Sequence, residues 1–256
     1  MTAVFTKQLA DGPGAPLVLS HALGLDHQMW SSTAALLAGE RPVLAYDHRG
    51  HGRSPAPPGP YSMDDLVGDA RDVIERWGRG PVIWVGLSLG GMAGQGLAIS
   101  CPDLVRALVL THTTARYPAA AREAWQQRIR LVAQGGMAAV VDLVLQRYLT
   151  ADVRATQPQL QEQLRRRVLT TDAAGYIASC AAVASVDWLD DLYRIACPTL
   201  VLAGELDAGA PPAMAREIQE RIRGARLEIV PGASHLSPLE QPAQFEAALR
   251  SFLAES

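Results

Sequence analysis

The sequence predicts an α/β fold in which helices cover both faces of a mostly parallel central sheet. Short apolar runs alternate along the chain with longer stretches of helical periodicity, as in successive strand–helix–strand units. Several of these runs are apolar at every position, which is typical of parallel strands buried on both faces. One long stretch of strong helix formers interrupts the alternation and predicts a helical insertion.

Six apolar runs are the candidate strands, and two stretches between or after them have clear helical patterns. Residues 63–77 place apolar side chains at helical spacing and acids near the start, where the helix dipole favours them. Residues 242–252 form the closing helix, with their large apolar side chains on one face. The predicted strands are Leu17–Ser20, Val43–Tyr46, Val82–Val85, Ala107–Leu110, Leu200–Ala203 and Leu227–Val230.

The predicted insertion covers residues 115–192, between the fourth and fifth of these strands. It contains no convincing strand and is rich in Ala, Leu, Gln and Arg. We expect residues 1–114 and 193–256 to form the core and residues 115–192 to form a cap over the end of the sheet. Since no low-complexity linker separates the two parts, we expect one folding unit.

Composition narrows the class of protein. The chain has 256 residues, of which 48% are hydrophobic and 19% charged, enough for one well-buried core. A net charge of −3 gives no electrostatic footprint for nucleic acid. There is no apolar run long enough to span a membrane and no secretory signal pattern, so we expect a cytoplasmic protein. The three cysteines match no metal or redox spacing.

The segment Gly86-Leu87-Ser88-Leu89-Gly90 carries the strongest chemical signal. It follows a strongly apolar run and precedes a helical stretch, which is the context of a nucleophile elbow. In such a turn the serine is strained and its neighbours two positions away must be small. The helix N-terminus behind the turn favours developing negative charge. We therefore predict that Ser88 is a nucleophile.

A serine hydroxyl needs a base to accept its proton. In folds built around this elbow, the order along the chain is serine, acid, histidine. Only His112 and His235 follow Ser88. His112 ends a predicted strand and suits a structural or pocket position, whereas His235 lies in a loop after the last strand. The pattern favours His235 as the base.

The acid is expected on a loop after a strand, between the serine and the base. Asp207 fits this position and would orient the imidazole and stabilise its charged form. Glu205 is the alternative. Two backbone N–H groups are needed for the oxyanion of a tetrahedral intermediate. We assign them to Leu89, directly after the nucleophile, and to Leu23, in the loop after the first predicted strand.

These residues resemble the α/β-hydrolase superfamily over essentially the whole chain. The segment from Asp47 to Ser54 is similar to a loop of that superfamily in which Asp47 and Arg49 have a bracing role. A closer similarity is to the 3-oxoadipate enol-lactonases, and the cap matches are the most telling because caps vary widely. The matching residues are Leu23-Gly24, Asp26, Met29-Trp30, Gly59-Pro60-Tyr61, Gly86–Gly91, Thr114-Ala115-Arg116, Trp125, Arg128, Gly136-Met137, Gly175-Tyr176, Cys180 and Ala182.

The resemblance implies a small-molecule lactone or ester as substrate, opened through an acyl-enzyme, with no metal or organic cofactor. The implied enol-lactone carries a free carboxylate, which arginine binds in two-pronged fashion. Arg128 with Trp125, three residues apart on one helix face, is the first candidate, and Arg116 is the alternative. Two departures, His21-Ala22 before the oxyanion loop and Leu89 after the nucleophile, would reshape the pocket.

Other functions share much of this pattern. A carboxylesterase or another small-ester or lactone hydrolase would keep the triad and differ in the cap pocket. A carbon–carbon bond hydrolase also remains open, as does a non-catalytic ligand sensor on the same fold. Epoxide hydrolase and haloalkane dehalogenase chemistry is disfavoured, because those mechanisms use an aspartate where this chain has Ser88.

Overall fold

A seven-stranded sheet forms the centre of the molecule in the computed structural model, which describes residues 3–255. Its strand order is β1-β3-β2-β4-β5-β6-β7. All neighbouring pairs are parallel except β1 and β3, which are antiparallel. The predicted α/β class and all six predicted strands are confirmed. The strands are β1 (Thr6–Ala10), β2 (Leu17–Ser20), β3 (Val43–Tyr46), β4 (Val82–Leu87), β5 (Val105–Thr111), β6 (Thr199–Gly204) and β7 (Arg226–Val230).

Strand β1 is the one strand that the sequence pattern did not predict. Its residues Thr6–Ala10 include polar side chains, and its first three positions are exposed. An edge strand with one free side needs no continuous apolar run, so hydrophobicity carries little signal there. Its pairing with β3 shifts register between Gln8 and Ala10, which indicates a bulge or irregularity.

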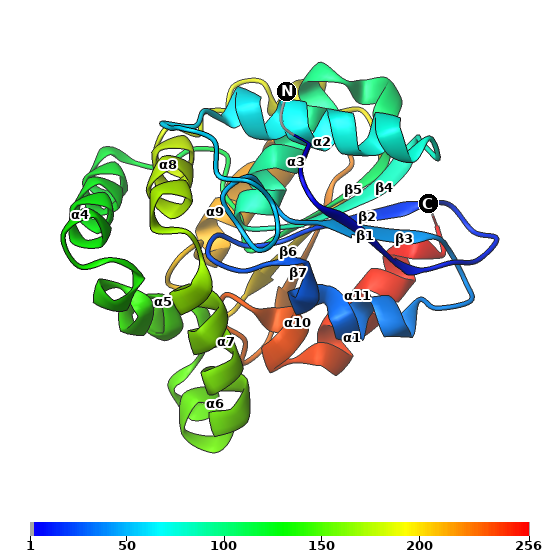
Figure 1. Ribbon diagram of the computed structural model, residues 1–256. Helices are drawn as coiled ribbons and strands as arrows, with labels where there is room; N and C mark the ends of the chain where they lie inside the picture. The colour runs from blue at the N-terminus through cyan, green and yellow to red at the C-terminus, as the bar shows by residue number, and fades with distance from the viewer. Residues whose placement is uncertain (1–2, 256) are drawn as a thin grey trace.

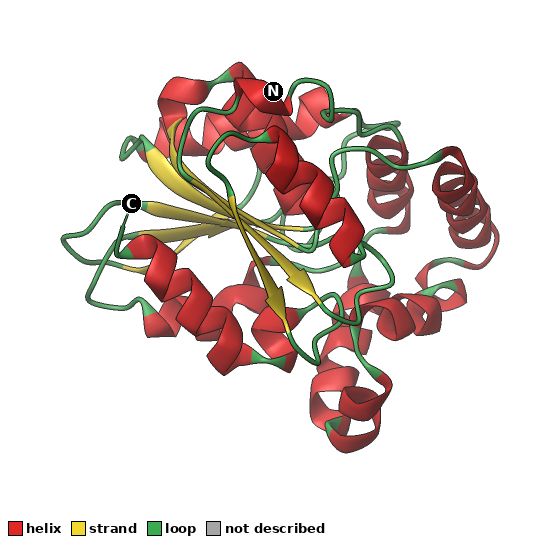
Figure 2. Ribbon diagram, turned by 180° about the vertical axis from the view of Figure 1, so that it is seen from behind, coloured by secondary structure: helices red, strands yellow, loops and turns green. Residues whose placement is uncertain are grey.

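Helices cover both faces of the sheet (Figures 1 and 2). In Figure 1, α2 and α3 lie above the strands, while α1, α10 and α11 lie below them. The predicted helix over residues 63–77 is confirmed, with a capping box in which Ser62 and Asp65 bond each other's backbone N–H. The helices outside the insertion are α1 (Ser31–Leu36), α2 (Met63–Trp77), α3 (Leu89–Ser100), α9 (Pro212–Arg221), α10 (Ser237–Glu240) and α11 (Pro242–Leu253).

The segment between β5 and β6 is helical and projects from one end of the sheet, as both views show (Figures 1 and 2). We call residues 115–192 the cap segment. An isolated bridge between Arg116 and Asp187 ties its two ends together. Its helices are α4 (Ala119–Gly135), α5 (Val141–Tyr148), α6 (Ala151–Thr156), α7 (Pro158–Thr170) and α8 (Ala173–Ala184).

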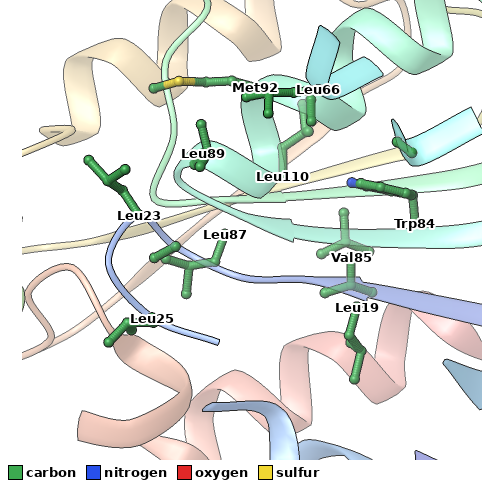
Figure 3. Packing of buried hydrophobic residues seen from close by; sticks show 14 of the residues in the cluster. Leu19, Leu23, Leu25, Leu66, Trp84, Val85, Leu87, Leu89, Met92 and Leu110 are labelled. Carbon is green, nitrogen blue, oxygen red and sulfur yellow. The ribbon is translucent and has the colours of Figure 1, made fainter. Parts of the chain in front are cut away.

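The core is centred on β4, in which every residue is buried. Figure 3 shows side chains of β2 and β4 packed together, with Leu19 beside Val85. Leu66 of α2 and Met92 of α3 close the layer above them. Ser88 directly follows β4, so a fully buried central strand positions the candidate nucleophile.

Candidate active site

Ser88 occupies a strained turn between β4 and α3. Its φ of 54° and ψ of −109° lie outside the common regions for a residue with a side chain. A Cβ on Gly86 would come 2.2 Å from the carbonyl oxygen of Gly90, and one on Gly90 would come 2.3 Å from that of Ser20. The turn therefore requires both glycines. Thr113 Oγ1 donates to the Ser88 carbonyl over 2.8 Å, which ties the turn to the segment after β5.

Asp207 and His235 come together at the same end of the sheet. Asp207 follows β6, His235 follows β7, and Nδ1 of His235 lies 2.7 Å from Oδ2 of Asp207. The other carboxylate oxygen, Oδ1, accepts from the N–H groups of Gly209 at 2.7 Å and Ala210 at 2.9 Å. Both side chains are buried. Oδ1 of Asp207 thus bonds the backbone of its own loop, while Oδ2 bonds the imidazole.

The electrostatics of this pair follow from burial and mutual attraction. Burial lowers the pKa of His235 below its ordinary value, and the charge of Asp207 opposes only part of this effect. For Asp207, burial favours the neutral acid, but the charge of His235 and the hydrogen bonds of His112 and His235 outweigh it. The pKa of Asp207 therefore lies well below its usual range. The pair combines an ionised acid with a neutral imidazole near pH 7.

The alternative acid has a different environment. Glu205 is exposed and accepts from the N–H of Gly232 at 2.9 Å through Oε2, away from His235. The structure thus brings Asp207, and not Glu205, to the imidazole.

The alternative arginine is also engaged elsewhere. Arg116 forms ion pairs with Asp187 and with Asp190 at the surface. Its guanidinium charge is already met by two carboxylates, so it has little left for a carboxylated ligand.

Leu23 and Leu89 lie in loops that follow neighbouring strands, since Ser20 of β2 pairs with Gly86 of β4. Leu89 is the first residue of α3, so its N–H has no carbonyl of the same helix to bond. The loop at Leu23 is held from the cap segment, because the Tyr148 hydroxyl donates to the Leu23 carbonyl over 2.5 Å. Figure 3 shows both leucine side chains at this end of the sheet.

Trp125 and Arg128 lie on α4 at a cavity of about 180 Å³. The Arg128 guanidinium stands 4.7 Å from the Trp125 ring centre. A second arginine, Arg147 of α5, stands 5.3 Å from the same ring and lines the same cavity. Arg147 donates to the carbonyl of Gly209 at 2.7 Å. Gly209 belongs to the loop that carries Asp207, which we call the acid loop. Within residues 3–255, neither Arg128 nor Arg147 forms an ion pair with a carboxylate, which suits an anionic ligand.

Sequence reasoning missed Arg147. It sits in an ordinary amphipathic helix pattern, and its position beside the acid loop depends on a long-range contact. Gly209 carries a trace of this contact in the sequence, because a Cβ there would come 2.4 Å from Nε of Arg147. Such a glycine cannot be distinguished from a turn glycine without the fold.

The loop after β3 has the bracing role that the superfamily resemblance implied. Asp47 accepts from the N–H of His27 at 2.7 Å and of Arg53 at 2.9 Å. Arg49 pairs with Asp69 at 2.6 Å and with Asp65 at 3.0 Å. These contacts tie the loop to η1 (His27–Trp30) and α2.

Two groups of side chains have a spacing that a metal ion also uses. Ligand atoms of His112, Asp207 and His235 lie within 4.8 Å of one another, and so do those of Asp26, His27 and Asp47. In both groups the imidazole nitrogen and the carboxylate are hydrogen-bonded to each other. We assign both groups to hydrogen bonding, which accounts for their contacts.

The fold and this site define a hydrolase of the α/β class. Residues 15–242 match the family described as "alpha/beta hydrolase fold", so the chain belongs to that family. Within residues 3–255, no helix combines the length and apolar character that crossing a membrane requires.

Among known proteins, the chain is similar to enol-lactonases, to esterases and to putative carbamate hydrolases. The chain is 33% identical over 244 residues to 3-oxoadipate enol-lactonase 2 of Acinetobacter baylyi, covering 95% of this chain and 90% of that one. It superposes on the enol-lactonase of Burkholderia xenovorans LB400 with a TM-score of 0.94 and 34% identity, covering 98% and 96%. It also superposes on a thermophilic esterase from Thermogutta terrifontis with malate bound. The TM-score is 0.91 and the sequence identity 29%, over 98% of this chain and 93% of that one.

Proposed function

We propose that this protein hydrolyses the ester bond of a small enol-lactone that carries a free carboxylate, converting 3-oxoadipate enol-lactone to 3-oxoadipate. The observation that carries the proposal is the strained Ser88 elbow at the same sheet edge as the Asp207–His235 pair. The similarity to two enol-lactonases, at 33% and 34% identity, supports the choice of substrate.

The reaction begins with proton transfer. Nε2 of His235 takes the proton of Ser88 as Oγ attacks the lactone carbonyl, and Asp207 stabilises the imidazolium. The N–H groups of Leu23 and Leu89 bind the oxyanion. The ring carbon–oxygen bond then breaks, and the enolate oxygen takes the proton from His235. The enol becomes a ketone, and the acyl group stays on Ser88.

Water completes the cycle. His235 removes a proton from a water molecule as its oxygen attacks the acyl carbon, and Ser88 leaves with that proton. The product carries a new carboxylate in place of the lactone carbonyl. These steps need proton transfer and two amide donors, so the proposal includes no metal and no organic cofactor.

In this proposal, residues 1–114 and 193–256 supply the reacting groups, and the cap segment supplies the pocket. Trp125 and Arg128 hold the free carboxylate of the substrate in the cavity beside the acid loop. A carboxylate in a partly buried site is stabilised by a planar guanidinium that can form two parallel hydrogen bonds. The malate bound to the Thermogutta esterase, a small dicarboxylate, supports an acidic ligand for this architecture.

Turnover of enzymatically generated 3-oxoadipate enol-lactone tests the proposal, with p-nitrophenyl acetate as a neutral ester control. We expect kcat/KM of about 10⁵ M⁻¹s⁻¹ or more for the lactone and a far lower value for the ester. Brisk ester cleavage without lactone turnover would replace the enol-lactonase assignment with a general esterase. Absence of both activities, together with no labelling of Ser88 by a fluorophosphonate, would indicate a binding protein.

A further inference from the structure

Asp207 bonds a second imidazole besides that of His235. Nδ1 of His112 lies 3.2 Å from Oδ2, the same oxygen that Nδ1 of His235 approaches at 2.7 Å. We propose that His112 is a positioning residue. It donates to the same oxygen of Asp207 as His235 does, and so reduces the stabilisation that this carboxylate gives to the charged form of His235. The inference rests on the proposed function of Asp207 and His235.

The position of His112 is unusual for a residue whose role is only to fill space. It is fully buried, and its φ of 50° places a side-chain residue in the left-handed region. Its N–H continues the sheet by donating to the Leu202 carbonyl at 2.8 Å. The left-handed conformation then directs the imidazole to Asp207, although it is a strained conformation for the backbone.

The ring is held at both nitrogens. Nε2 lies 2.6 Å from the hydroxyl of Ser237, the first residue of α10. The Gly204 N–H lies 3.3 Å from Nδ1, but it can donate only to an unprotonated nitrogen. An unprotonated Nδ1 would set its lone pair against the Asp207 carboxylate in a buried site, which is costly. Nδ1–H therefore donates to Asp207, and the Ser237 hydroxyl donates to Nε2.

These contacts saturate the carboxylate. Oδ1 accepts two backbone N–H groups, and Oδ2 accepts two imidazole N–H groups, which together use its four acceptor positions. Each donor to Oδ2 withdraws part of the negative charge that would otherwise stabilise a charged His235. The donor from His112 thus keeps His235 neutral to lower pH, and a neutral imidazole is the form that accepts a proton from Ser88.

Several other groups besides His112 lie around His235. Asp207 favours the charged form of His235, while Arg147 of α5 disfavours it. The neutral ring of Tyr148, also from α5, stacks on His235 with centroids 5.2 Å apart. Glu240 of α10 lies near His112 and bonds the N–H groups of Thr150 and Ser234 at 2.7 and 2.8 Å. A substitution of His112 leaves these groups in place.

Two substitutions separate the two ring contacts. In His112→Asn the amide nitrogen falls near the position of Nδ1, so a donor to Asp207 remains, and asparagine tolerates positive φ. In His112→Gln the longer amide reaches towards Ser237 instead, and the donor to Asp207 is lost. Thermal melting of both variants establishes that they fold. If His112→Gln does not fold, His112→Ala removes the same donor with less bulk.

The measurement is the acid limb of kcat/KM, with the ring of His235 followed by NMR titration in the same variants. We expect His112→Gln to move both midpoints to higher pH by about 0.5–1 unit, with little change in KM. His112→Asn should stay close to wild type. Midpoints that do not move in a folded His112→Gln variant would overturn the inference and leave His112 a purely structural role. The NMR titration needs no substrate, so it separates this outcome from failure of the proposed reaction.

Discussion

The phenol ring of Tyr148 stacks on the imidazole of His235, with ring centres 5.2 Å apart and planes 20° apart. The hydroxyl of the same residue donates to the Leu23 carbonyl over 2.5 Å. One cap residue therefore contacts both the candidate base and the loop of Leu23, which is proposed to offer an oxyanion donor. Both contacts are buried, so water does not compete for them.

Tyr148→Phe keeps the stacked ring and removes the hydroxyl. We expect kcat to fall about fivefold while KM changes little, because one hydrogen bond of ~1 kcal/mol no longer holds the Leu23 loop. Tyr193→Phe is the matched control, since Tyr193 is 72% exposed. Steady-state kinetics of the two variants provide the comparison. An unchanged kcat with a lowered melting temperature would show that the hydroxyl serves stability alone.

Ser88→Ala removes the proposed nucleophile with the loss of a single atom. We expect most turnover to disappear, while the fold and ligand binding persist, because the elbow conformation depends on Gly86 and Gly90. Product formation and thermal melting are measured side by side. A rate within a few-fold of wild type would rule out Ser88 as the nucleophile.

The pH dependence follows from the state of His235. The base must be neutral to accept a proton, so activity falls as pH drops through its pKa. Burial lowers this pKa from its ordinary value, with the charge of Asp207 in partial opposition. We therefore expect the acid limb of kcat/KM to have its midpoint below ~6.5. A midpoint clearly above that value would mean that Asp207 outweighs burial.

Arg128→Gln tests the proposed carboxylate site. Loss of a charge-assisted hydrogen bond of ~1.5–3 kcal/mol should raise KM for the carboxylated lactone by roughly 10- to 150-fold. The KM of p-nitrophenyl acetate, a neutral ester, should change little. Arg116→Gln serves as the control, because Arg116 is already paired with Asp187 and Asp190. Should Arg147→Gln produce the larger effect on the lactone, the carboxylate binds at Arg147 instead.

Much of the fold follows from local sequence pattern. Strands β2 and β3 have the predicted bounds, since buried parallel strands leave a continuous apolar run between polar turns. Helix α2 is predicted to the residue by its periodicity and by its acidic first turn. Strand β1 escapes this reasoning because its fold position, and not its apolarity, makes it a strand.

The candidate site likewise has residues that local sequence pattern predicts and residues that it does not. Ser88, Asp207 and His235 can be proposed from the sequence because each follows a recognisable strand, and parallel strands bring their carboxyl ends to one edge. The partners of His112 and the placement of Arg147 depend on contacts 95 and 62 residues away along the chain. No local pattern encodes such contacts. They arise only when the cap segment and the loops after β5 and β6 pack together.

The cap segment and the core make a close backbone contact at Gly50 and Gly175. A Cβ on Gly175, in α8, would come 2.5 Å from Cα and 2.7 Å from the carbonyl oxygen of Gly50. Both neighbours are backbone atoms, and Gly50 is constrained by its φ of 73°. Tyr176, the next residue of α8, lies against Gly24 in the loop of Leu23, as a Cβ on Gly24 would come 3.1 Å from its ring.

Gly175→Ala should therefore lower the free energy of unfolding by ~1–3 kcal/mol, because overpacking forces two backbone segments apart. Gly68→Ala is the matched control: Gly68 lies inside α2, where an added Cβ meets no atom within 4 Å. This control should gain ~0.5–1 kcal/mol, since alanine favours the helix. Urea unfolding of both variants gives the comparison.

If both glycine substitutions stabilise the protein, the cap segment can move at this contact with no loss of stability. If Gly175→Ala destabilises the protein and also lowers kcat, the contact between Gly175 and Gly50 helps to position the loop of Leu23.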